Sequence, residues 1–407
     1  MTEEVAVLVL RDNYLQTQSL NVREKTMLEE QARFMKSLEK AGRLNRAIEF
    51  LPSDEELALR RTKKIGLTAP ERAILLAYSK IALFDELLAS KLPDDSDISN
   101  ALVRYFPEPI RQRYQTEMEQ HPLRREIIAT QVTNGIINRV GSTFVHRIQE
   151  ETGARAPDVV RAYLLTREIF DFTSFWRAVE ELDNKVPDAV QVEMLVDSER
   201  LTTSATLWFL RYPNLRADIV RTSEHFTSGV RTVAANLDTI LSPAESATIK
   251  AREEELCASL VPRDLAKRVA SFDLLYSALD IVEIAIATKR SVNEVAGVYF
   301  AAGDRLSFSW VASQIEMLPA DSHWQMLAKA TLGEDLLKLQ TDLTRQILRQ
   351  SPDEKGQNAL ISLWEAQKKN ELERVRQVLS DLKSAGNGTI DFPMLSVAVR
   401  ELKNLVM

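Results

Sequence analysis

The stretch that decides the fold is HPLRREIIATQVTNGIINRVGSTFVHRIQEETGA, residues His121 to Ala154. Its pattern predicts one long buried helix with a polar seam. Thr130, Asn134 and Asn138 are spaced four apart, so they share one face of that helix. Gly135 and Gly141 would let another helix approach closely.

Three cations, Arg124, Arg125 and Arg139, flank the seam. Two interpretations follow for this group. It is either a pocket for a small anionic effector, such as an amino acid, or a buried hydrogen-bond network between tightly packed helices. Buried amides are usually satisfied by neighbouring groups rather than by ligands, which favours the network.

Residues that break secondary structure are scarce in the chain as a whole. Its 407 residues include 12 glycines and 14 prolines, which predicts long elements and favours helices. Helix starts are marked by five capping-box pairs, in which a Ser or Thr precedes a Glu by three residues. We therefore expect an all-α fold, a multi-helix bundle with long antiparallel helices. The pairs are Ser53/Glu56, Thr68/Glu71, Ser242/Glu245, Ser291/Glu294 and Ser351/Glu354.

Individual segments sharpen this expectation. Residues 70–88 are apolar almost all round, which predicts a central core helix. Residues 331–350 carry one apolar stripe, and we expect the next helix, 353–385, to return antiparallel to them. The runs 5–10 and 190–196 look like strands, but neither has a hairpin turn or a second strand to pair with, so both are assigned to helices.

The domain organisation follows from the breaks between helices. None of the breaks is long enough to be a flexible interdomain linker. We expect a single all-α domain over 1–407, with two lobes, 1–212 and 213–407, as the alternative division.

Charge and composition exclude several classes of partner. The formal net charge of −7 argues against nucleic acid, which usually leaves a basic footprint. The longest charge-free run, residues 127–138, is too short and too polar to span a bilayer. The lone Cys257 excludes an internal disulfide, as in a reducing compartment. With no secretory signal at the N-terminus, these features predict a soluble cytoplasmic chain without a membrane contact.

The motifs of cofactor chemistry are missing from the sequence. The one G-x-G, Gly386 and Gly388, lacks the third glycine of a dinucleotide fingerprint and a preceding strand. The four histidines are scattered and none has metal-site spacing. There is no G-x-S-x-G, and three glutamates before Cys257 would blunt its reactivity. We expect no catalytic, cofactor or metal residue in this chain.

Four stretches besides residues 121–154 carry a family resemblance: VLRDNYLQTQ (9–18), GLTAPERAILLAYSK (66–80), YFP (105–107) and AYLLTREIF (162–170). Together they resemble the large bacterial NAD-specific glutamate dehydrogenases. The resemblance is specific over residues 5–211 and weaker beyond.

The resemblance implies a non-catalytic helical C-terminal domain of a very long polypeptide, without its Rossmann-type catalytic domains. The parent enzyme would oxidise L-glutamate to 2-oxoglutarate and ammonia with NAD. The chain's role would be to support the catalytic domain and assembly into a homo-oligomer; the alternative is a regulatory small-molecule-binding module. Asn13, Tyr14 and Gln18 would lie near the junction with the catalytic part, where interdomain contact, local capping and plain surface exposure are all compatible with them.

Overall fold

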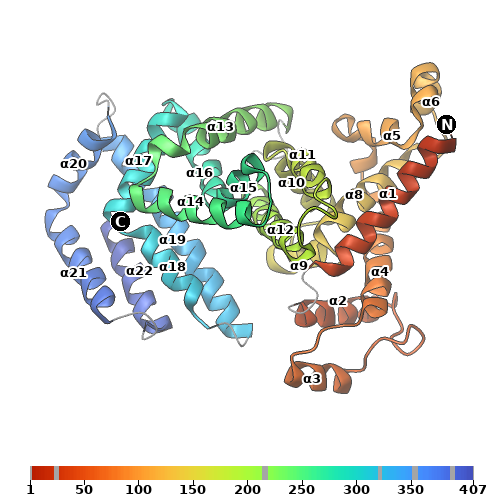
Figure 1. Ribbon diagram of the computed structural model, residues 1–407, viewed down its shortest axis with the longest axis horizontal. Helices are drawn as coiled ribbons and strands as arrows, with labels where there is room; N and C mark the ends of the chain where they lie inside the picture. The colour runs from red at the N-terminus through yellow and green to blue at the C-terminus, as the bar shows by residue number, and fades with distance from the viewer. Residues whose placement is uncertain are drawn as a thin grey trace. The chain divides into compact units, whose positions relative to one another are not determined.

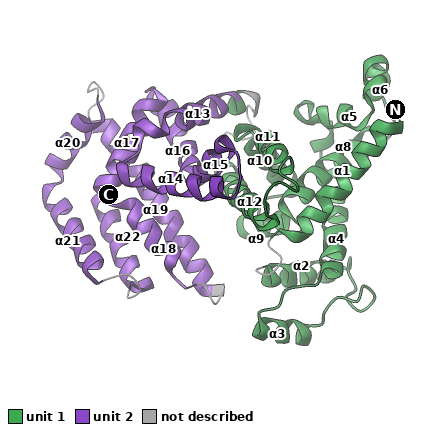
Figure 2. Ribbon diagram, in the orientation of Figure 1, with its two compact units in different colours: residues 1–223 green, residues 224–407 purple. Residues whose placement is uncertain are grey.

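The computed structural model describes residues 2–22, 27–212, 219–319, 323–350, 356–385 and 390–406. These residues form helices and contain no strand, which confirms the all-α prediction (Figure 1). The strand-like runs 5–10 and 190–196 lie inside the helices α1 (Thr2–Asn21) and α12 (Asp188–Arg211), so their assignment to helices is confirmed. The chain divides into two compact units, residues 1–223 and 224–407 (Figure 2).

Unit 1 is organised around α8, against which α1, α4 and α5 pack. A second contact layer joins α10 to α12, α9 and α11. Besides α1 and α12, its elements are α2 (Leu28–Lys40), α3 (Asp54–Lys63), α4 (Ala69–Leu88), the 3-10 turns η1 (Leu92–Asp94) and η2 (Ser96–Ile98), α5 (Asn100–Tyr105), α6 (Glu108–Arg113), α7 (Gln115–Glu119), α8 (Arg124–Val140), α9 (Phe144–Thr152), α10 (Ala156–Ile169) and α11 (Phe172–Glu180).

Unit 2 is organised around α19, which packs against α16, α17, α18, α20 and α22. Its helices are α13 (Ile219–Ile240, whose first residues belong to unit 1), α14 (Pro243–Ala258), α15 (Arg263–Ala270), α16 (Phe272–Thr288), α17 (Val292–Arg305), α18 (Phe308–Met317), α19 (His323–Gln350), α20 (Gln357–Gln367), α21 (Lys369–Ala385) and α22 (Phe392–Val406). The predicted apolar stripe of α19 is confirmed, because its members are all buried: Leu332, Leu336, Leu339, Leu343 and Ile347.

The prediction of one continuous helix over residues 121–154 is wrong. The segment forms α8 and α9, separated at Gly141, whose φ of 82° takes the backbone out of the helical region. The expected close approach of a second helix is also absent at both glycines. Among the described residues, a Cβ built on Gly135 or Gly141 would have no atom of another segment within 4 Å.

Two further predictions are wrong in their extent. Helix α4 is buried along one face only, and Ile81 on the other face is 55% exposed, so α4 is not enclosed on all sides. The predicted helix 353–385 is divided at Lys368 into α20 and α21. Residues 353–355 of the prediction lie outside the described residues. The first part of this segment, α20, packs on α19, whereas α21 packs mainly on α22, so the expected helix does not return along α19 as one element.

The predicted helix starts are largely confirmed. Ser53, Thr68 and Ser242 each form a capping box with the glutamate three residues later. Ser291 accepts a hydrogen bond from the amide of Glu294, but the Glu294 carboxylate pairs with Arg290 instead of closing the box. Ser351 and Glu354 lie outside the described residues.

Candidate functional site

The N-terminal helix α1 is fastened to unit 1 through its polar side chains. The Tyr14 hydroxyl donates a hydrogen bond to Asp183 (3.0 Å), and the Gln18 amide donates to Tyr14 (3.3 Å). Burial, followed by the bond to Asp183, raises the pKa of Tyr14 above its ordinary value, so the hydroxyl remains a donor. Asn13 is exposed, and its carbonyl accepts the Thr17 hydroxyl within the helix.

A buried ion pair lies beside this contact. The Arg139 guanidinium is 2.6 Å from the Glu180 carboxylate and lies over the Trp176 ring at 4.8 Å from its centroid. Arg11 of α1 approaches the same carboxylate at 3.6 Å. Because the Arg139 side chain is 8% exposed, its charge depends on Glu180 for compensation. Four elements of unit 1 therefore meet here: α1, α8, α11 and the turn that precedes α12.

The predicted seam along α8 changes its environment from one end to the other. Thr130 is exposed and donates to the Glu126 carbonyl, Asn134 is half-buried, and Asn138 is buried. The Asn138 Oδ1 atom has no hydrogen-bond partner among the described residues. The neighbouring Gly135 carbonyl accepts the Tyr163 hydroxyl at 3.2 Å.

Arg124 and Arg125 do not join Arg139. Both pair with Asp94, and Arg125 also donates to the carbonyls of Leu88 (2.8 Å) and Ser90 (2.9 Å). They begin α8 and Arg139 ends it, so about 20 Å of helix separates them at 1.5 Å per residue. Arg139 therefore lies with Glu180 close to Tyr14, whereas the other two arginines lie with Asp94.

A small cavity touches Arg139. Its volume of about 30 Å³ matches the volume of a single water molecule. Gln31 Oε1 and Arg139 Nη1, both on lining residues, lack hydrogen-bond partners among the described residues. A larger open hollow of about 400 Å³ lies between α1 and the start of α12; Tyr14, Gln18, Asp183, Asp188 and Gln191 are among its lining residues.

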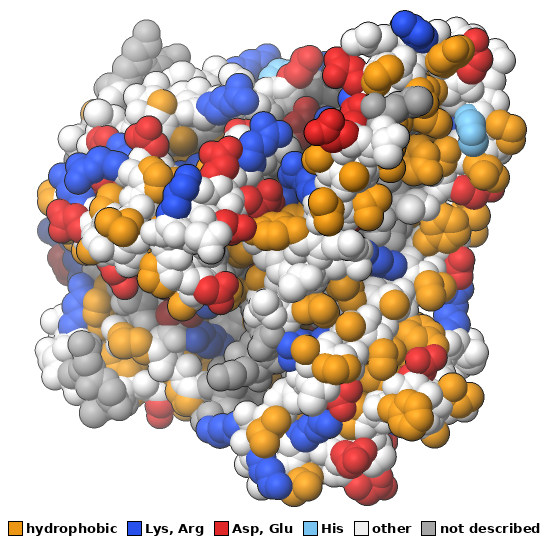
Figure 3. All heavy atoms as spheres, turned by 45° about the vertical axis from the view of Figure 1, so that its right-hand side comes forward, with side chains coloured by type: hydrophobic (Ala, Val, Ile, Leu, Met, Phe, Trp, Pro, Cys, Tyr) orange, Lys and Arg blue, Asp and Glu red, His pale blue; other side chains and the backbone are white. Residues whose placement is uncertain are grey.

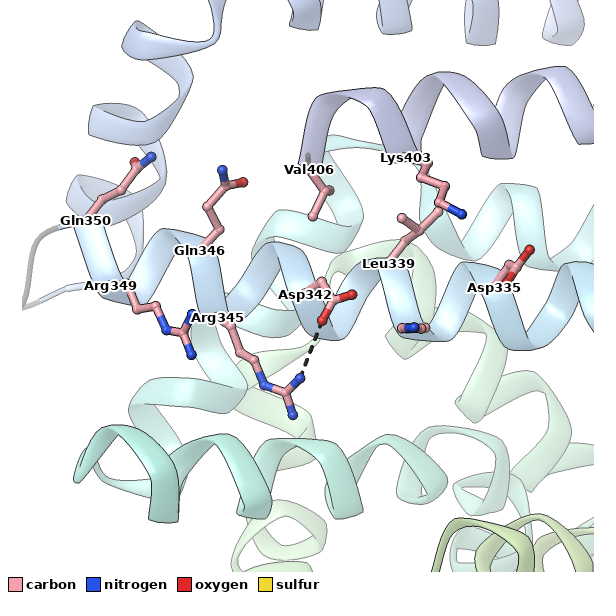
Figure 4. A pocket seen from close by; sticks show the side chains of 10 residues that line it. Asp335, Leu339, Asp342, Arg345, Gln346, Arg349, Gln350, Lys403 and Val406 are labelled. Carbon is pink, nitrogen blue, oxygen red and sulfur yellow. Dashed lines mark hydrogen bonds and ion pairs between the residues drawn. The ribbon is translucent and has the colours of Figure 1, made fainter. Parts of the chain in front are cut away.

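Unit 2 carries an open groove of about 650 Å³ along α19 and the end of α22. Figure 4 shows that Arg345 and Arg349 point to the same side of α19, while Lys403 comes from α22. Arg345 pairs with Asp342 at 3.4 Å and with Glu283. The groove therefore combines paired charges with the exposed cations Arg349 and Lys403.

The outer surface of α1 is unusually apolar. In this helix only Leu15 is buried. Figure 3 shows hydrophobic side chains reaching the surface over unit 1, in the right-hand part of the view. Five aliphatic residues of α1 are 40–67% exposed: Val5, Val7, Leu8, Val9 and Leu10.

Two other kinds of feature are absent from the described ranges. No three or more His, Cys, Asp or Glu side chains gather in a way that could hold a metal ion. Nor does any helix there combine the length and hydropathy needed to cross a membrane.

Comparison with known proteins decides the family. A family model described as "Glutamate dehydrogenase, C-terminal" matches residues 64–404. The chain belongs to this family. Among curated members, it is 37% identical to an NAD-specific glutamate dehydrogenase of Halomonas elongata, 38% to one of Pseudomonas aeruginosa and 32% to one of Mycobacterium tuberculosis. Each match covers 100% of this chain and 25% of the relative, so the chain spans about a quarter of their length.

The sequence did not reveal which side chains of this glutamate dehydrogenase C-terminal region bind α1 and Arg139. Glu180, Asp183 and Gln191 follow no motif, and the bond from Tyr14 to Asp183 joins residues 169 apart. The sequence does show an acidic run at residues 180–183. Such a run indicates a charged surface, but it does not tell which side chain the carboxylates contact.

Proposed function

We propose that this chain is the non-catalytic C-terminal region of a large NAD-specific glutamate dehydrogenase, and that it supports the catalytic part of the same polypeptide. The parent reaction would convert L-glutamate, NAD and water to 2-oxoglutarate, ammonia and NADH. Support comes from the family match and from relatives named NAD-specific glutamate dehydrogenase that are about four times as long.

The observation that carries this proposal is the exposed aliphatic surface of α1. Large contiguous apolar patches on a protein surface mark interaction sites. Each half-exposed Val or Leu that becomes covered contributes on the order of 1 kcal/mol. Because α1 is itself fastened by Tyr14 and Arg11, that surface is presented on a fixed helix, and we infer that it packs against the rest of the polypeptide. Asn13, which is exposed on α1, would lie at this interdomain contact.

The test compares the parent enzyme with and without these 407 residues. Glutamate-dependent NADH formation and molar mass by light scattering are measured on both forms. We expect the truncated form to lose solubility, assembly or activity, because its covered apolar surface becomes exposed. A truncated enzyme with unchanged mass, stability and turnover would reject a supporting role.

Two further properties of the parent belong to the same proposal. We infer that the parent is a homo-oligomer, and light scattering of the parent tests this. We also infer a cytoplasmic location, supported by the single unpaired Cys257. Fractionation of cells that express the parent protein tests this location.

A regulatory role is the second candidate, and the groove of unit 2 favours it. Its volume lies within the range of small-molecule sites, and its exposed cations Arg349 and Lys403 would attract an anionic effector. The seam at Arg139 offers only the cavity of about 30 Å³. A thermal shift of the dialysed chain with amino acids or dicarboxylates, abolished by Arg349→Gln, would support this role. The absence of any shift would count against it.

A further inference from the structure

The loop between α2 and α3 holds an aromatic residue in a costly position. Phe50 has a φ of 53°, in the left-handed region where residues other than glycine have a strained backbone. Its side chain is also 90% exposed, so no burial offsets that strain. The Leu51 amide donates to the Arg46 carbonyl (2.9 Å), closing a helical turn in which glycine is the usual residue at the position of Phe50.

The loop that carries Phe50 is firmly held. Leu44 and Leu51, on either side of it, are buried in the core of this part of unit 1. The Arg46 guanidinium donates to Glu39 (2.9 Å), to the Pro52 carbonyl (3.0 Å) and to Asp54 (3.1 Å). The exposure of Phe50 is therefore imposed by the fold and is not the result of a loose loop.

A second apolar side chain projects from the same loop. Ile48 is 69% exposed, and the Asn45 side chain accepts hydrogen bonds from the amides of Ala47 (3.1 Å) and Ile48 (3.4 Å). An aromatic side chain that fills a pocket is the kind of anchor that carries binding energy in protein interfaces, and burial of Ile48 would add apolar area. Because the loop is already ordered, little conformational entropy would be lost on binding.

We infer that Phe50 and Ile48 form a preformed anchor that inserts into an apolar pocket on the part of the parent polypeptide outside these 407 residues. This inference rests on the proposed function. The curated relatives supply the missing length, since this chain covers 25% of each. A second copy of the chain is a poorer match, because its open hollows described above are lined mainly by charged and amide side chains.

The first experiment makes Phe50→Gly in the 407-residue chain and in the full-length enzyme, where we expect opposite effects on stability. Phe50→Gly removes backbone strain, so we expect the melting temperature of the 407-residue chain to rise. In the full-length enzyme the same change removes the anchor, so we expect its melting temperature to fall. Lys64→Gly is the matched control: Lys64 also has a φ of 53° and is exposed, but is charged, so both forms should gain stability. A gain in both forms with Phe50→Gly would overturn the inference.

The second experiment separates this anchor from the α1 contact. Single cysteines at Ile48 and Val7 are alkylated in the isolated chain and in the full-length enzyme, and each peptide is followed by mass spectrometry. We expect labelling of both to slow by about tenfold or more in the full-length enzyme. Slow labelling at Val7 alone would overturn the anchor and leave the proposed function standing, whereas unchanged labelling at both would reject both. Protection of Ile48 in the isolated chain that grows with its concentration would identify a second copy as the partner and overturn the inference.

Discussion

Tyr14 donates a 3.0 Å hydrogen bond to Asp183, although 169 residues separate them along the chain. Asp183 also accepts from Gln191 at 2.9 Å, so one carboxylate connects α1 with the start of α12. This polar contact compensates for how little of α1 is buried, since Leu15 alone among its residues is enclosed.

Removing the Tyr14 hydroxyl should therefore loosen α1. For Tyr14→Phe we expect a loss of about 1 kcal/mol in the free energy of unfolding, as for an ordinary hydrogen bond, and faster amide exchange along residues 2–21. Thr17→Ala is the control, because the Thr17 hydroxyl donates to the Asn13 carbonyl within α1. Equal exchange rates in both variants would show that the bond does not hold the helix.

The buried pair of Arg139 and Glu180 should be costly to break from one side. Arg139→Met leaves Glu180 with the more distant Arg11, so we expect a loss of about 3 kcal/mol in urea denaturation. Combining Arg139→Met with Glu180→Gln should recover part of that loss, because no uncompensated charge then remains buried. Additive losses in the double variant would contradict this account.

Gly229 of α13 is required by its contact with α16. A methyl group at Gly229 would overlap the side chain of Val282, so we expect Gly229→Ala to cost about 1–3 kcal/mol. Val282→Ala in the same chain should relieve the overlap. Gly333→Ala in α19 is the control: the added methyl group meets nothing within 4 Å, and alanine favours a helix by about 1 kcal/mol.

His146 should make unit 1 sensitive to mild acid. Burial is the main cause that lowers its pKa from 6.5, opposed by the nearby Glu150. Since the unfolded chain protonates first, this contribution to stability is present above pH 6.5 and is lost as the pH falls toward the folded pKa. His146→Gln should flatten the dependence of the unfolding free energy on pH below 6.5. An unchanged slope would show that other groups cause this pH dependence.

Local patterns predicted which segments become helices, because helical spacing and capping residues act within a few positions. Capping at Ser53 and Ser242 and the buried stripe of α19 followed from the sequence in this way. The break at Gly141 did not, because a glycine within a helical pattern is compatible with both continuation and termination.

The candidate site was predictable only in part. The resemblance singled out Tyr14 and Gln18, which lie one helical turn apart on α1 and are bonded to each other. Sequence spacing grouped Arg124 and Arg125 with Arg139, although the two ends of α8 have separate partners. Which carboxylate compensates a given arginine depends on tertiary packing, and sequence spacing carries no information on it.

The division into units 1–223 and 224–407 has a consequence for how heat unfolds this protein. Two bodies with separate cores need not melt together, and a chain of this length is outside the size range in which all-or-none melting is the rule. We therefore expect calorimetry to resolve two overlapping heat-absorption peaks. Loss of the Arg139 pair should displace one peak, and Gly229→Ala should displace the other.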